Sequence, residues 1–73
     1  MTQREIAVAN IREAETWGEA DSIKGLLSEA ARGVERGAYG HAGYLIGVGM
    51  SRCTHLLPWQ SDILIRTTHS LTA

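Results

Sequence analysis

Apolar residues recur at helical spacing along most of the chain, and glycines and one proline divide the pattern into four segments. The clearest segment covers residues 19–36. Charged residues occupy one side of it, and Gly37 follows as a left-handed stop. Its apolar side carries Ile23, Leu26, Leu27, Ala30, Ala31 and Val34. This pattern predicts a helix over residues 19–36, with Asp21 or Ser22 as its N-cap.

The segment before it, residues 2–17, also follows helical spacing. Thr2 stands at the N-cap position, and Glu5 follows at the third helical position, as in a capping box. Gly18 is placed to end the helix. The inward stripe is formed by Ile6, Ala7, Asn10, Ile11, Ala14 and Trp17. We predict a helix over residues 2–17.

Residues 39–56 form a third segment that is apolar nearly all round. One face carries Ala42, Ile46, Gly49, Met50, Cys53 and Leu57. The opposite face is scarcely more polar and carries Tyr44, Gly47, Val48, Ser51 and His55. Such a helix is typically buried on two sides, so this one is predicted to be central. Its glycines each lower helix propensity by roughly 1 kcal/mol, and close helix approach across Gly40, Gly43 and Gly47 is expected to offset that cost.

The last segment, residues 58–71, allows two structures. Pro58 suits the first turn of a helix, with Trp59, Ile63, Thr67 and either Leu64 or Leu71 facing inward. Residues 63–68 are also rich in β-branched side chains, which favour a strand. A lone strand would need a second copy to pair with, so the helix is favoured and the strand stays an alternative.

Together these segments predict one all-α domain over residues 1–73, a small bundle of three to four helices with the third at its centre. A single core of this size supplies about 3–5 kcal/mol. Cys53 is the single cysteine, so an internal disulfide is excluded. Self-association, such as a homodimer, or a protein partner is therefore expected to add stability.

Charge is nearly balanced, with a formal net charge of −1 and a pI of about 6.3. No basic footprint for phosphate backbones is present, so no nucleic-acid partner is expected. The first residues lack the apolar core of a signal peptide, and the longest weakly charged stretch, residues 37–51, is too short to cross a bilayer. The expectation is a cytoplasmic protein without membrane contact.

No pattern of residues predicts catalysis, a cofactor or a metal site. The P-loop, the G-x-S-x-G elbow and the H-E-x-x-H motif are absent. Cys53, His41, His55 and His69 do not have the paired spacing of a zinc site. Glu13, Glu15, Glu19 and Asp21 lack the alternation of a calcium loop and suit a solvated face. The protein is therefore predicted not to be an enzyme.

Two short motifs resemble known families. Thr2-Gln3-Arg4-Glu5-Ile6-Ala7 resembles the opening of the first helix in helix-turn-helix proteins, which implies a small dimeric DNA-binding regulator as an alternative function. The chain continues past this hexapeptide without that family's glycine turn. The order Gly37, Tyr39, Ala42 is similar to the turn of tetratricopeptide-type helix pairs, which implies an antiparallel hairpin of the second and third helices.

Protein binding without catalysis is the favoured function. The second face of the third helix is either covered by the first and fourth helices or left for a partner. The candidate contact residues are those on this face: Tyr44, Gly47, Val48, Ser51 and His55. Chains of this size include adaptors, assembly subunits and inhibitors, among them phage or mobile-element proteins of the anti-CRISPR kind. A ligand carrier ranks lower, because four short helices are expected to leave little room for a pocket of about 300 Å³.

Overall fold

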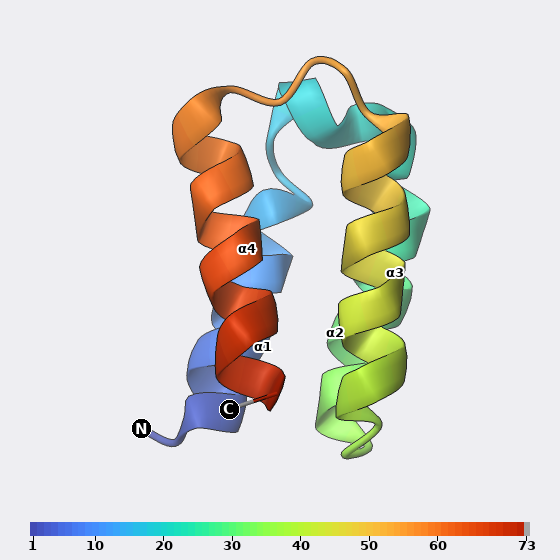
Figure 1. Ribbon diagram of the computed structural model, residues 1–73. Helices are drawn as coiled ribbons and strands as arrows, with labels where there is room; N and C mark the ends of the chain where they lie inside the picture. Colours follow the sequence, from blue (N-terminus) through green and yellow to red (C-terminus); the bar gives the residue numbers. More distant parts are fainter. Residues whose placement is uncertain (73) are drawn as a thin grey trace.

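The computed structural model describes residues 1–72 as an all-helical bundle (Figure 1). Its elements are α1 (Gln3–Ala14), the 3₁₀ helix η1 (Gly18–Ile23), α2 (Lys24–Glu35), α3 (Tyr39–Arg52) and α4 (Pro58–Thr72). The predicted all-α class is confirmed. The last segment is a helix, so the alternative of a strand paired with a second copy is wrong.

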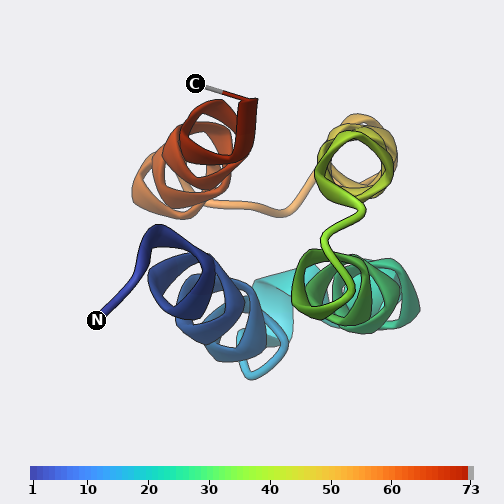
Figure 2. The same cartoon turned by 90° about the horizontal axis from the view of Figure 1, so that it is seen from below.

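The four α-helices run alternately up and down and stand at the corners of a square when viewed along the bundle (Figure 2). Each packs mainly against two neighbours, in the order α1, α2, α3, α4 and back to α1. No helix is central, and the prediction that α3 is central is wrong. Short connections place sequential helices side by side, so all four share the interior equally.

The core lies along the axis of this square. Each helix contributes one large aliphatic side chain with no exposed surface: Ile11, Leu27, Ile46 and Leu64. Full burial of such a side chain stabilises the fold by about 1.5–3 kcal/mol. Small residues fill the rest of the interior and let the helices approach closely: Ala7, Ala14, Ala20, Ala30, Ala31 and Ala42.

Helix α1 begins as predicted and ends earlier. The Thr2 hydroxyl accepts a hydrogen bond from the Glu5 amide at 3.2 Å, and the Glu5 carboxylate accepts one from the Thr2 amide at 3.0 Å. The helix ends at Ala14 instead of residue 17, because the Thr16 amide and hydroxyl both donate to the Glu13 carbonyl and tighten the last turn. Ile6, predicted to face inward, is 39% exposed.

The predicted helix over residues 19–36 is two elements. Residues 18–23 form η1, and α2 begins only at Lys24, with Ile23 as an N-cap that makes no side-chain hydrogen bond. The predicted cap at Asp21 or Ser22 is therefore wrong. Glycine, aspartate and serine have low helix propensity, and the tighter 3₁₀ turn still buries Ala20 and Ile23.

The turn between α2 and α3 matches the prediction closely. Gly37 has φ +81°, the left-handed conformation expected of it. The Ala38 amide donates to the Gly33 carbonyl at 2.8 Å, and the Gly37 amide donates to the Val34 carbonyl at 3.0 Å. This pair of bonds is a Schellman motif, and it reverses the chain into the predicted α2–α3 hairpin.

The crossover from α3 to α4 is held by two side chains. Helix α3 ends at Arg52, not at residue 56, because Cys53 is extended and its thiol donates to the Glu19 carbonyl at 3.1 Å. The Gln60 side chain, near the start of α4, accepts a hydrogen bond from the Leu57 amide at 2.8 Å. Gln60 is buried and was not predicted to face inward.

Candidate protein-contact face

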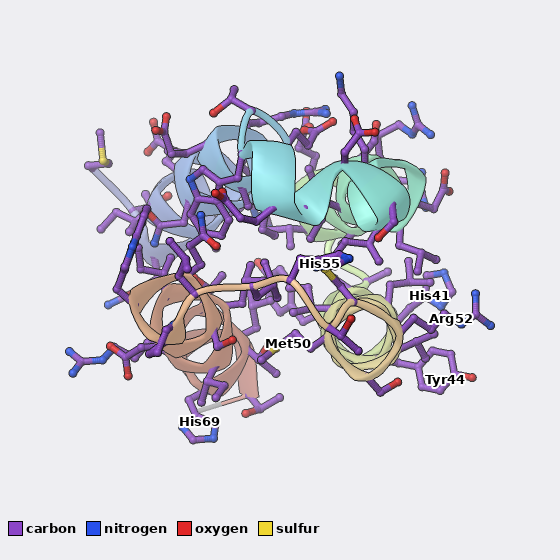
Figure 3. All side chains as sticks on the ribbon, turned by 90° about the horizontal axis from the view of Figure 1, so that it is seen from above. His41, Tyr44, Met50, Arg52, His55 and His69 are labelled. Carbon is purple, nitrogen blue, oxygen red and sulfur yellow. The ribbon has the colours of Figure 1, made fainter. Side chains whose placement is uncertain are left out.

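The outward side of α3 is open to solvent. Ala42 and Ile46 are buried on one side of the helix. Tyr44, two positions from each of them, is 68% exposed. In the view along the bundle, Tyr44 points away from all the other helices (Figure 3). Helices α1 and α4 do not cover this side, so the second buried face expected for α3 does not exist within one chain.

Two glycines on the same side of α3 have no packing role within the chain. A Cβ atom built at Gly40 or Gly47 would meet nothing within 4 Å. Gly43 alone of the three predicted positions lies at a helix contact, where a Cβ would be 3.3 Å from Thr68 Cγ2. The expected close approach across all three glycines is therefore wrong for Gly40 and Gly47, whose cost in helix propensity has no offset within the chain.

The remaining candidate residues lie in different surroundings. Val48 is half-buried, and Ser51 is exposed, with its hydroxyl donating to the Val48 carbonyl at 2.9 Å. His55 is exposed but lies on the crossover beyond the end of α3, apart from Tyr44 (Figure 3). The contact face is accordingly defined as Gly40, Tyr44, Gly47, Val48 and Ser51, without His55.

Two basic side chains flank this contact face, and the sequence pattern alone did not single them out. His41 and Arg52 project from α3 on the same side as Tyr44, whereas Met50 points toward α4 (Figure 3). Both are exposed. Their spacing from Tyr44 could have predicted this position. His41 precedes Tyr44 by three residues and Arg52 follows it by eight, and both spacings place side chains on one side of a helix.

Other exposed apolar side chains are scattered over the bundle. Trp59, predicted to face inward, is 54% exposed and contacts Trp17 edge-on, with ring centroids 5.3 Å apart. Leu57, also assigned to the inner face, and Ile65 on α4 are exposed as well. Thr67 faces inward as predicted, and Leu64 is the buried one of the two leucines proposed for this side. Gln60 takes the inward position that was predicted for Trp59.

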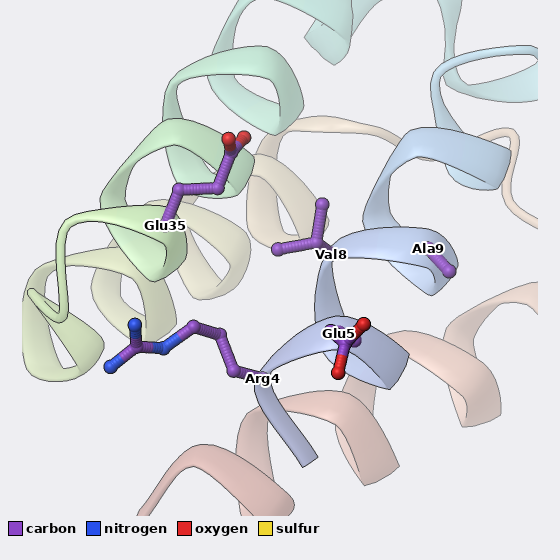
Figure 4. A pocket seen from close by; sticks show the side chains of 5 residues that line it. All are labelled: Arg4, Glu5, Val8, Ala9 and Glu35. Atoms are coloured by element: carbon purple, nitrogen blue, oxygen red, sulfur yellow. The ribbon is translucent and has the colours of Figure 1, made fainter. Parts of the chain in front are cut away.

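A surface groove between α1 and the end of α2 has a volume of about 440 Å³ (Figure 4). It is larger than the pocket the sequence led us to expect, but it is open. Its polar side chains already have partners: Arg4 Nε donates to the Tyr39 hydroxyl at 2.9 Å, Glu5 belongs to the capping box, and Glu35 pairs with Arg12 at 3.3 Å. Val8 and Ala9 supply a small apolar wall.

The candidate metal ligands lie apart. Among residues 1–72, no three histidine, cysteine, aspartate or glutamate side chains are grouped so that they could hold one ion. Cys53 is buried, as predicted, and its thiol faces the Glu19 carbonyl. His41, His55 and His69 are all exposed, in agreement with the surface positions expected for them.

Hydrogen bonds lower the pKa of three surface carboxylates. The Gln60 Nε2 donates a hydrogen bond of 2.8 Å to the Glu19 carboxylate, and this bond lowers the pKa of Glu19 below the usual value of 4.5. Arg32, at 2.6 Å, lowers the pKa of Glu29 in the same way. The capping box with Thr2 lowers the pKa of Glu5. These groups stabilise the fold and do not form a reactive cluster.

No protein-family model, curated protein or solved structure matches this chain. Within residues 1–72, none of the helices combines the length and the apolar character needed to cross a lipid bilayer.

Proposed function

We propose that this protein is a non-enzymatic protein-binding module that contacts its partner through the outer side of α3. One observation carries the proposal. Tyr44 projects from the middle of a helix face that has no charged residue in its centre, between two glycines that open onto free space. Tyrosine is enriched at the energetic centre of protein interfaces, and glycine lets a second backbone approach closely.

The energetics of the free chain support the same proposal. An exposed helix gains stability from alanine and loses roughly 1 kcal/mol for each glycine in its place. Gly40 and Gly47 contact no other element, so the fold gains nothing from their lack of a side chain. A requirement for close approach by a partner would explain both glycines.

Nucleic-acid binding, the alternative function, has weaker support. Arg12, Arg32 and Arg66 are each paired with a carboxylate of the same chain. Phosphate contacts need a cluster of cations that are free to release counterions. Within residues 1–72, the cations without a salt bridge are spread from α1 to α3: Arg4, Lys24, Arg36 and Arg52. An inhibitor encoded by a phage or mobile element is one kind of protein-binding module, so this narrower suggestion falls within the same proposal.

Truncation of Tyr44 tests the proposal. Tyr44→Ala should leave the helical circular dichroism and the melting temperature nearly unchanged, because the side chain is exposed, and it should abolish complex formation in pull-downs from the native host. Ile6→Ala, which truncates another exposed apolar side chain, on α1, is the control and should retain the complex. A folded Tyr44→Ala protein that keeps every interaction of the wild type would refute the proposal.

A further inference from the structure

Charge is segregated along the chain, and α3 lies in the part without negative charge. Residues 36–61 contain two arginines and no carboxylate, whereas the rest of the chain contains five cations and eight carboxylates. Both ends of α3 and its flanking connections fall within residues 36–61. The contact face is therefore surrounded along its own helix by positive charge only.

This positive charge is free mainly at the C-terminal end of α3. Within residues 1–72, Arg52 forms no salt bridge, and it projects on the same side of α3 as Tyr44 (Figure 3), about 12 Å further along the helix at 1.5 Å per residue. At the other end, Arg36 likewise forms no salt bridge within residues 1–72, but the Glu29 carboxylate lies near enough for Arg36 and His41 to lower its pKa, after the larger effect of Arg32. Arg52 is thus a cation without a carboxylate partner on the same side of α3 as the exposed Tyr44 ring, and a carboxylate from outside would gain most by pairing with it.

The shape of the contact face limits the kind of partner. Gly40, Tyr44, Gly47 and Ser51 follow one another at intervals of four, three and four residues, the spacing of a helix seam. This seam is about 16 Å long at 1.5 Å per residue. A strip of this length, with one exposed ring between two glycines, matches a single helix lying along α3.

A second copy of the chain fits the seam less well. A two-fold interface buries the same patch from both subunits, so it would bring the unpaired Arg52 of each copy to one seam whose own residues include no carboxylate. Like charges at an interface are unfavourable. The charge pattern therefore favours a different, acidic partner.

We infer that the occupant of the contact face is an acidic amphipathic helix of another protein, an inference that rests on the proposed function. Its small residues lie against Tyr44 and the two glycines, and one of its carboxylates pairs with Arg52. The glycines let the two helix backbones come close, and the unpaired guanidinium fixes the register of the partner.

A displayed library of helical peptides, selected on the immobilised wild-type protein at low salt, tests this inference. We expect the enriched peptides to carry net negative charge. Their affinity should fall about tenfold or more for Arg52→Glu and for Tyr44→Ala. Lys24→Glu, the same charge reversal at an exposed position on the first turn of α2, is the control and should change the affinity little.

The other outcomes separate the inference from the proposed function. Peptides that depend on Tyr44 but are neutral or basic, or that bind Arg52→Glu equally well, would overturn the acidic partner and leave the contact face intact. If duplex DNA displaces the peptides, the occupant is DNA and the acidic helix is wrong. If the wild type sediments as a dimer that Tyr44→Ala dissociates, the occupant is a second copy of the chain. A selection without any Tyr44-dependent binder would count against the proposed function as well.

Discussion

Gln60 donates a hydrogen bond of 2.8 Å from its Nε2 to the carboxylate of Glu19, 41 positions earlier in the chain. The other end of the same amide accepts the Leu57 amide hydrogen at 2.8 Å. Gln60 thereby joins η1 to the start of α4 at one end of the bundle. Because the Gln60 side chain is buried, both bonds must be present for its polar atoms to be satisfied.

The Glu19–Gln60 bond predicts how stability depends on acid. The pKa of Glu19 is lowered in the folded state, so its contribution is complete above the usual value of 4.5 and is lost as the pH falls through the lower folded value. The melting temperature of the wild type should therefore decrease below about pH 4.5, and that of Glu19→Gln should decrease less steeply as the pH falls. Thermal melts from neutral pH to pH 3 check this. An unchanged slope in Glu19→Gln would show that the bond is not formed in solution.

Glycine substitutions should have opposite effects at two positions. Gly47→Ala adds a methyl group in open space within a helix, so we expect a gain in unfolding free energy of up to about 1 kcal/mol. Gly37→Ala forces a side chain into a left-handed conformation and should lose about 1 kcal/mol or more. Urea denaturation measures both. A destabilised Gly47→Ala would mean that the glycine has a structural role that the packing does not reveal.

Nucleic acids should not bind specifically at physiological salt. In gel shifts at about 150 mM salt, we expect no discrete complex with genomic or random duplex fragments, because paired arginines and a net negative chain provide little electrostatic affinity. A complex that survives this salt concentration and weakens for Arg52→Glu would make the DNA-binding alternative the better account.

Most of the fold followed from the sequence, because the apolar spacing and the caps at Thr2 and Gly37 agree with the final structure. Thr2, Glu5 and Gly37 fulfil their predicted capping roles, and the four-helix order is as expected. The wrong boundaries have two kinds of cause. Local turns end α1 at Ala14 and delay α2 to Lys24, whereas a tertiary contact ends α3. Helix α3 ends where the Cys53 thiol donates to the Glu19 carbonyl. These residues are 34 positions apart in the sequence, so no local pattern predicts the bond.

The candidate site was only partly predictable for a related reason. Helical spacing places Tyr44, Gly47 and Ser51 on one side of α3, and the structure places them there. Whether that side is covered depends on how many helices surround α3, which the spacing does not determine. His55 was assigned to the face only because α3 was expected to continue to residue 56, and Arg52 became a candidate once its exposure and lack of a partner were visible.

The most direct test of the central claim is photo-crosslinking from the contact face in the native host. A benzophenone amino acid replaces Tyr44 in one variant and His69, exposed on α4 and away from this face, in a second (Figure 3). We predict one discrete crosslinked species from position 44 and none from position 69, because only the first lies within reach of a partner on α3. A discrete species from position 69 with none from position 44 would contradict the account.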